Sequence, residues 1–175
     1  MIVPARLVVM GVSGVGKSTV GRALSERLGV DFAEGDDFHS AASVARMAAG
    51  IALTDDDRAP WLERIGRWLG ERQEGGVASC SSLRRAYRDR IRRLCPDVAF
   101  VHLAAGASLV RERVASRSGH YMPASLVDSQ FEALEELAPD EVGIRLDASE
   151  EPAQLVERAS AFAQRLGSSS MRSPS

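Results

Sequence analysis

The sequence predicts an α/β fold in which a parallel β-sheet is covered by helices on both faces. Short apolar segments alternate with helical patterns along the chain, and the first apolar segment, residues 6–10, lacks the polar alternation of a surface strand. A glycine-rich turn joins that segment to a helical pattern that begins at Lys17. Strands separated by helices form βαβ units with right-handed crossovers, so the predicted architecture is a three-layer α/β/α sandwich.

The bounds of the predicted elements follow from apolar spacing and from residues that start or end helices. Apolar residues recur at three- and four-residue spacing after Lys17, and Gly29 is placed to end that helix. Pro60 is expected to open another helix, which buries Trp61 and Ile65 on one face. Strands are expected at residues 6–10, 30–33, 77–81, 98–103 and 143–146, and helices at 17–28, 41–49, 60–72, 83–94, 107–117, 124–137 and 152–166.

Size and composition narrow the class of protein. The chain has 175 residues, enough for one domain, and its 24 acidic and 22 basic side chains give a net charge of -2. A nucleic-acid partner is not expected, because such proteins need a basic excess. No apolar run approaches the roughly 20 residues of a membrane span, so no membrane association is expected. Cys80 and Cys95 lie outside any C-x-x-C or Cys/His cluster, which indicates a reducing compartment and a cytoplasmic location.

The domain is assigned to residues 1–167. The segment 168–175 is rich in serine and has too few apolar residues to pack, so a disordered tail is expected there.

Residues 11–18 form a phosphate-binding motif. They read GVSGVGKS and satisfy G-x-x-x-x-G-K-[ST] between a predicted strand and a predicted helix. The glycines let backbone N–H groups turn toward an anion, and the positive end of the following helix favours the same charge. Lys17, the one lysine of the chain, can reach the β- and γ-phosphates, and the Ser18 hydroxyl can bind Mg²⁺. The predicted phosphate-binding residues are Gly11, Ser13, Gly14, Val15, Gly16, Lys17, Ser18 and Thr19.

Several classes of nucleoside triphosphate protein are disfavoured. A GTPase reads guanine with an Asn-Lys-x-Asp element, and this chain has no asparagine and a single lysine. A motor or helicase needs more chain and an apolar strand that ends in a metal-holding aspartate, which neither residues 77–81 nor 98–103 provide. A small kinase that phosphorylates a metabolite fits better, and a nucleotide-binding module without turnover is the alternative.

Carboxylates follow the second predicted strand. Residues 34–39 read EGDDFH and lie where open α/β sheets bind ligands, beyond the carboxyl ends of the strands. One carboxylate there can orient an attacking hydroxyl and another can hold Mg²⁺ through water. A solvated acidic turn that caps the next helix is the alternative.

Arginines near the same edge can meet an anionic acceptor. Arg58 is a candidate fork for a carboxylate, although an arginine in an acidic loop more often joins a surface ion-pair network. Arg84 and Arg85 follow the third predicted strand and are further candidates. Arg88, Arg90, Arg92 and Arg93 are expected to coat the solvated face of their helix.

A second arginine pair precedes a loop. Arg113 and Arg117 are four residues apart and face the same side of a helix, and residues 118–123 contain Gly and Pro. The pair predicts either a lid, about residues 113–126, that closes over the phosphates or an ordinary surface pair.

Taken together, several segments resemble the gluconate kinase family, the thermoresistant-gluconokinase type of small P-loop kinase. The resemblance spans residues 7 to about 137; its first motif is shared by all P-loop kinases, and the other four, in this order, are much more specific. The segments that carry it are 11–19, 35–39, 53–62, 80–89 and 119–123 with Ser129 and Gln130.

The resemblance implies an adenylate-kinase-like fold with five parallel strands in the order 2-3-1-4-5. It implies ATP with Mg²⁺, D-gluconate as the acceptor, 6-phosphogluconate as the product and a homodimer; another small hydroxy acid such as shikimate is the alternative acceptor. Arg84 stands where the family often has lysine, which changes the reach of that contact. The implied roles are catalysis for Lys17, Asp36 and Arg117, ATP binding for Arg113, substrate binding for Asp36, His39, Arg58, Arg84, His120 and Gln130, and metal binding for Ser18 and, through water, Glu34.

Overall fold

The computed structural model describes residues 4–116 and 124–169, which build one five-stranded sheet in the order β2-β3-β1-β4-β5. Every neighbouring pair of strands is parallel. The sheet therefore confirms the predicted strand order. The strands are β1 (Arg6–Met10), β2 (Asp31–Glu34), β3 (Gly76–Ser79), β4 (Ala99–Ala104) and β5 (Gly143–Asp147).

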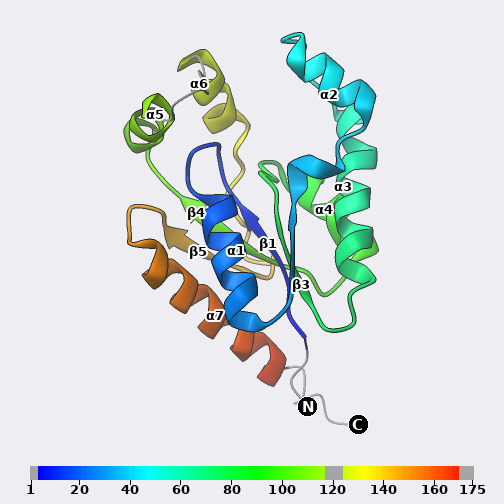
Figure 1. Ribbon diagram of the computed structural model, residues 1–175, viewed down its shortest axis with the longest axis vertical. Coiled ribbons are helices and arrows are strands. Elements are labelled where there is room, and N and C mark those ends of the chain that lie inside the picture. The colour runs from blue at the N-terminus through cyan, green and yellow to red at the C-terminus, as the bar shows by residue number, and fades with distance from the viewer. Residues whose placement is uncertain (1–3, 117–123, 170–175) are drawn as a thin grey trace.

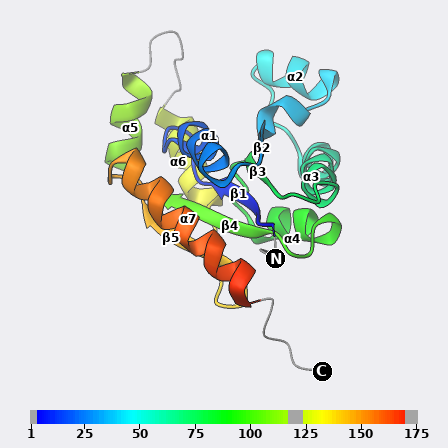
Figure 2. The ribbon, with the colours of Figure 1, turned by 60° about the horizontal axis from the view of Figure 1, so that its bottom comes forward.

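Helices cover both faces of the sheet, as the alternation of elements predicts (Figure 1). Helices α1 (Lys17–Leu28) and α7 (Pro152–Ser169) lie against one face, and α3 (Asp55–Gly70) and α4 (Arg85–Leu94) lie on the opposite side, which the rotated view in Figure 2 separates. The remaining helices lie toward the carboxyl ends of the strands and flank the turn between β1 and α1 (Figure 1). They are the short 3₁₀ helix η1 (Gly35–Phe38), α2 (Ala41–Ala48), α5 (Ala107–Ala115) and α6 (Ala124–Ala133).

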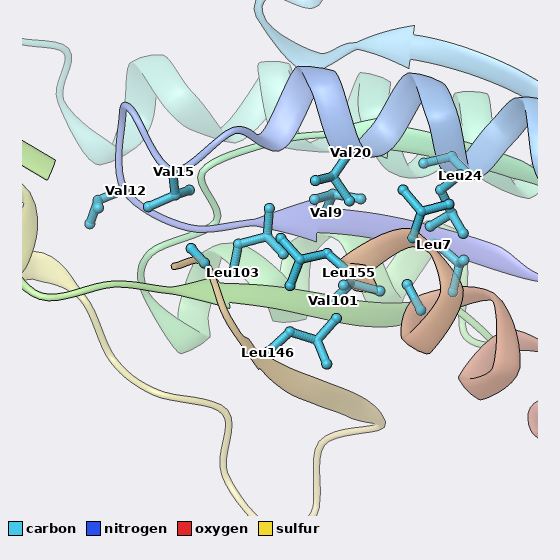
Figure 3. Close-up of a cluster of buried hydrophobic side chains, with 14 of the residues drawn as sticks. Leu7, Val9, Val12, Val15, Val20, Leu24, Val101, Leu103, Leu146 and Leu155 are labelled. Carbon is cyan, nitrogen blue, oxygen red and sulfur yellow. The ribbon is translucent and has the colours of Figure 1, made fainter. Parts of the chain in front are cut away.

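Strand β1 alternates between two apolar cores. Leu7 and Val9 join the core beneath α1 and α7 (Figure 3), whereas Val8 and Met10 join the core beneath α3 and α4. All four side chains are fully buried, and burial of each is worth about 1.5–3 kcal/mol. A central strand with both faces covered explains the apolar run without alternation.

Helix α3 begins before the predicted start at Pro60. The Thr54 hydroxyl accepts a hydrogen bond from the N–H of Asp57, and the Asp57 carboxylate accepts one from the N–H of Thr54. This reciprocal capping box satisfies two N–H groups at the helix start, so the helix opens at Asp55 and Pro60 lies inside it. The prediction that Pro60 opens the helix was therefore wrong.

The ends of two other helices also correct the predictions. Helix α7 continues to Ser169, so residues 168 and 169 are helical rather than part of a tail, and residues 170–175 lie outside the described chain. Helix α6 ends at Ala133 rather than at 137, because the chain leaves it to place the N–H of Glu135 on the carbonyl of Leu83, 2.7 Å away. No helix in the described ranges is long and apolar enough to cross a membrane.

Candidate active site at the carboxyl edge of the sheet

The turn between β1 and α1 forms the predicted phosphate cradle. Gly16 adopts a φ of 98° at the N-cap of α1, a left-handed conformation that glycine accepts without strain. Because Gly16 has no side chain with which to cap the helix, the first N–H groups of α1 can meet an anion. Lys17 donates a hydrogen bond from Nζ to the carbonyl of Val12 at 3.0 Å, so its side chain folds back over the glycine-rich loop.

The two residues predicted to hold a metal are in contact. Ser18 donates from Oγ to Oε1 of Glu34 at 2.7 Å, and Ser79 donates from Oγ to the same oxygen at 2.5 Å. The other carboxylate oxygen of Glu34 is 3.5 Å from the guanidinium of Arg22. Ser79 is buried and pairs with Glu34 in the strand register, a neighbour that only the order of the strands could have revealed.

This pair of oxygens fits Mg²⁺. A hydroxyl and a carboxylate are hard oxygen ligands, and Mg²⁺ keeps several waters instead of filling its shell with protein groups. Across the described residues there is no cluster of three or more His, Cys, Asp or Glu side chains that could hold a metal ion. Ser18 and Glu34 would therefore hold the ion together with water and the phosphates of a nucleotide.

Close packing directs the chain that follows β2. A β-carbon on Gly35 would lie 2.0 Å from the carbonyl oxygen of Ser79, so the position requires glycine. Trp61 donates from Nε1 to the carbonyl of Gly35 at 2.7 Å. The turn of η1 then leaves Asp36 exposed at the carboxyl edge of the sheet.

His39 packs on helix α3, which carries Arg58. Its ring stacks on Trp61 with 4.2 Å between the ring centroids. Burial lowers the pKa of His39, the charge of Asp36 opposes that shift, and the charges of Arg58 and Arg64 add to it. The imidazole is therefore mostly neutral at pH 7.

Cys80 is a buried thiol near the same edge. Burial raises its pKa to about 11, so the sulfur is protonated and is no nucleophile at neutral pH. Cys80 and Cys95 are both free and buried.

Arg58 is held by a side chain that sequence reasoning left without a role. Arg58 donates from Nη1 to the Tyr87 hydroxyl at 3.2 Å, and that hydroxyl donates to Oδ1 of Asp55 at 2.6 Å. The guanidinium also lies 5.5 Å from the centre of the Tyr87 ring. The start of α3 and the start of α4 are thus joined by a polar network that contains the predicted carboxylate fork.

Arg84 approaches the same tyrosine. Burial raises the pKa of Tyr87, as does the hydrogen bond to Asp55, whereas the charges of Arg58 and Arg84 lower it. Arg84 is the exposed N-cap residue of α4. Arg58 contacts the Tyr87 side chain, and the carbonyl of Arg84 accepts from the N–H of Tyr87 at 3.0 Å, so Tyr87 is linked to two of the predicted anion-binding arginines.

Arg85 turns away from this group. Both terminal nitrogens of its guanidinium donate to the carboxylate of Asp140, at 2.7 and 2.8 Å. The hypothesis that Arg85 meets an acceptor is corrected, since its fork is occupied by an acid of the chain itself.

Arg88 is not on the solvated face of α4, as the sequence pattern suggested. Its side chain and that of Glu141 are both fully buried, and they form a bidentate ion pair with a shortest distance of 2.7 Å. Burial raises the pKa of Glu141, but hydrogen bonds from Arg88, the N–H of Ala138 and Arg92 outweigh burial and hold the pKa at about 2. Sequence reasoning missed this pair because its members are far apart in the chain.

The low pKa of Glu141 predicts acid sensitivity. Its ordinary value is 4.5 and its value in the fold is about 2, so the carboxylate stabilises the fold fully above pH 4.5 and loses that effect as the pH falls toward 2. We expect the difference in unfolding free energy between the parent and Glu141→Gln to narrow over this interval. Urea unfolding at pH 7, 4.5 and 3 measures it, and a difference that does not change with pH would contradict the assignment.

Arg113 and Gln130 contact the phosphate loop from α5 and α6. Arg113 donates to the carbonyls of Val15, at 3.2 Å, and Ala148, at 2.8 Å. Gln130 accepts from the N–H of Ser13 at 2.7 Å and donates to its hydroxyl at 3.0 Å. Gln130, predicted to bind substrate, is thus found on α6 in contact with Ser13 of the phosphate loop. Arg117 and His120 lie outside the described residues, as does the centre of the predicted lid.

The fold and the site define a small P-loop kinase. A model of the AAA domain family matches residues 7–138. The chain is 44% identical over 157 residues to a gluconokinase of Gluconobacter oxydans, covering 88% of each chain, and 41% identical over 155 residues to the thermosensitive gluconokinase of Escherichia coli, covering 86% of this chain and 83% of that one. A crystal structure of a gluconokinase from Sinorhizobium meliloti superposes with a TM-score of 0.88 at 43% identity, covering 98% of each chain. The chain belongs to the gluconokinase family.

Proposed function

We propose that this protein transfers the γ-phosphoryl group of ATP to D-gluconate and releases 6-phosphogluconate and ADP. The relatives at 41–44% identity are gluconokinases. The observation that carries the proposal within this chain is that Trp61 joins the turn carrying Asp36 to helix α3, which carries Arg58, beside the β-sheet edge that also holds the phosphate loop. An acceptor with a carboxylate at one end and a reacting hydroxyl at the other needs an arginine to bind the carboxylate and an acidic side chain to orient the hydroxyl.

Each residue has a distinct task in an in-line transfer. The phosphate loop and Lys17 bind the β- and γ-phosphates, and Lys17 with Arg117 neutralises charge on the group in transfer. Ser18 and, through water, Glu34 would hold Mg²⁺, which would supply further neutralisation of the charge on the phosphate oxygens. Asp36 accepts a hydrogen bond from the attacking hydroxyl and turns it toward the phosphorus.

The acceptor is held by a neutral histidine and by cations. Arg58 and Arg84 bind the carboxylate, and His39 and His120 hydrogen-bond the hydroxyl groups of the sugar acid. The contacts of Arg113 with Val15 and Ala148 support a place for it on the nucleotide side. The net charge of -2 supports small-molecule substrates rather than nucleic acid, and a cytoplasmic location follows from such a metabolic role. The homodimer implied by the family is tested by sedimentation of the purified protein.

Replacement of Arg58 tests whether a cation reads the carboxylate. We expect Arg58→Ala to raise the KM for gluconate at least tenfold, an effect of about 1.4 kcal/mol or more, with the KM for ATP nearly unchanged. The variant should also discriminate less between gluconate and the neutral polyol sorbitol, because a lost charge contact affects only the charged acceptor. Steady-state kinetics on both acceptors measures this.

Arg46→Ala is the matched control for Arg58→Ala. Arg46 is an exposed arginine of α2. Its guanidinium lies 3.7 Å from the carboxylate of Asp57, which is in the first turn of α3, the helix that also carries Arg58. Its loss should leave the kinetic constants for gluconate and for sorbitol unchanged. Equal loss of activity on gluconate and sorbitol in the Arg58 variant would contradict a role in reading the carboxylate.

A further inference from the structure

Arg88 is a fully buried cation that none of the tasks above uses. Its guanidinium has five N–H donors, and its contacts extend in three directions. Nε and Nη2 donate to the two carboxylate oxygens of Glu141 at 2.7 and 3.0 Å. Nη1 donates to the carbonyls of Ser82, at 2.9 Å, and Leu83, at 3.3 Å, and Nη2 reaches the carbonyl of Glu136 at 3.3 Å.

Two of those carbonyls belong to the loop that leads from β3 to Arg84. Ser82 has a φ of 45°, the one left-handed non-glycine residue in the described chain, and it is buried. Such a conformation persists only where the surroundings hold it. Arg88 supplies that hold on one side. On the other side, the carbonyl of Ser81 accepts from the N–H of Gly11 in the phosphate loop at 3.2 Å.

The same loop is attached to the chain beyond α6. The carbonyl of Leu83 accepts from the N–H of Glu135 as well as from Arg88, and Glu141 accepts from the N–H of Ala138 at 2.8 Å. Arg88 therefore lies at the junction of the loop before α4, helix α4 itself and the segment 134–141 that follows the helix carrying Gln130.

Position along α4 connects this junction to the acceptor. Arg88 is one turn beyond Arg84 and its N–H bonds the carbonyl of Arg84 at 3.3 Å, while Tyr87, which holds Arg58, is its immediate neighbour. A shift of the loop carbonyls would move Arg84 directly and the start of α4 with it.

We propose that Arg88, paired with Glu141, is a positioning residue that fixes the loop 81–84 and the start of α4 so that Arg84 and Arg58 meet the carboxylate of the acceptor together. This inference rests on the proposed function for the identity of the acceptor. The contacts by which Arg88 fixes the loop 81–84 do not depend on the proposed function.

Fold stability alone does not require a charge here. A buried ion pair loses hydration, and well-packed apolar residues of similar volume often serve stability as well or better. Apolar side chains could not, however, donate to the carbonyls of Ser82 and Leu83. The arginine is explained by the geometry that it imposes.

The test compares Arg88→Lys with Arg92→Gln. Arg92 also donates to Glu141 and to Asp89, but it bonds neither loop carbonyl, so its loss weakens the same cluster without releasing the loop. We expect Arg88→Lys to raise the KM for gluconate at least tenfold with the KM for ATP within about twofold of the parent. Arg92→Gln should change the melting temperature but neither KM. A purely structural role would instead lower the melting temperature in both variants and leave the gluconate KM of Arg88→Lys at the parent value.

A second variant and a second measurement keep the test decisive. If Arg88→Lys does not fold, the double variant Arg88→Met with Glu141→Leu removes both charges together and should retain the fold while the acceptor KM rises. Amide hydrogen exchange of residues 82–84 should speed up at least tenfold in either Arg88 variant and stay at the parent rate in Arg92→Gln.

The exchange measurement needs no substrate, so it separates this inference from the proposed function. A parent protein that does not phosphorylate gluconate would overturn the proposed function, and the KM comparison would then use the acceptor that the parent does phosphorylate. Parent exchange rates at residues 82–84 in the Arg88 variants, or faster exchange with an unchanged acceptor KM, would overturn the positioning role.

Discussion

Lys17→Ala is expected to lower kcat by about a thousandfold or more, because the ammonium stabilises charge that develops on the transferred phosphoryl group. The side chain is partly exposed and belongs to neither apolar core, so its loss should leave the fold intact. Steady-state kinetics and a thermal melt on the same preparation measure both statements. A rate within tenfold of the parent would show that the phosphate cradle is wrongly assigned.

Lys17→Arg is the control for charge at this position. It keeps the positive charge but replaces a compact ammonium by a planar fork on a different stem. We expect it to recover only a small part of the lost rate, since the single Nζ of Lys17 lies 3.0 Å from the carbonyl of Val12 and a guanidinium would not place one nitrogen in the same way. Full activity in this variant would mean that charge alone is sufficient.

Asp36→Asn is expected to lower kcat by about 100- to 10,000-fold, the range of a positioned proton acceptor, with little change in ATP binding. The amide keeps the shape of the side chain and loses the basic oxygen. Asp37→Asn is the matched control, since Asp37 is an exposed carboxylate in the same turn of η1. Its activity should stay within threefold of the parent. Equal losses in the two variants would indicate that the acidic turn acts through its net charge and not through one oriented oxygen.

The architecture could be predicted because its signals are local. The buried run at β1, the glycine-rich turn and the regular alternation of elements each depend on neighbouring residues, and the structure confirms the parallel sheet that they imply. The nearness of Ser18 and Glu34 could also be predicted, since Ser18 follows β1 through the phosphate loop, Glu34 ends β2, and the carboxyl ends of these strands meet at one edge of the sheet. Helix ends were less predictable. The capping box of Thr54 and Asp57 places the start of α3 at Asp55, ahead of the start that Pro60 indicates.

The burial of Arg88 could not be predicted from its own helix. Nothing in the local sequence distinguishes Arg88 from the other arginines of α4. It is buried because it pairs with Glu141, which lies beyond α6 in the chain. The partner of Arg85 is hidden in the same way, because Asp140 belongs to that returning segment. Long-range polar pairs leave no periodic pattern, whereas apolar faces do. Tyr87 was missed for a related reason, since its role depends on contacts with a different helix.

The most direct test of the proposed function is ADP release by the parent protein over a panel of acceptors, with the product identified by phosphorus NMR. The panel holds D-gluconate, sorbitol, shikimate and a control without acceptor. We predict rapid turnover with gluconate, phosphorylation of its terminal primary hydroxyl, and at least a hundredfold lower kcat/KM for each of the other acceptors. Efficient turnover of shikimate without turnover of gluconate, or ADP release that no acceptor stimulates, would contradict the assignment.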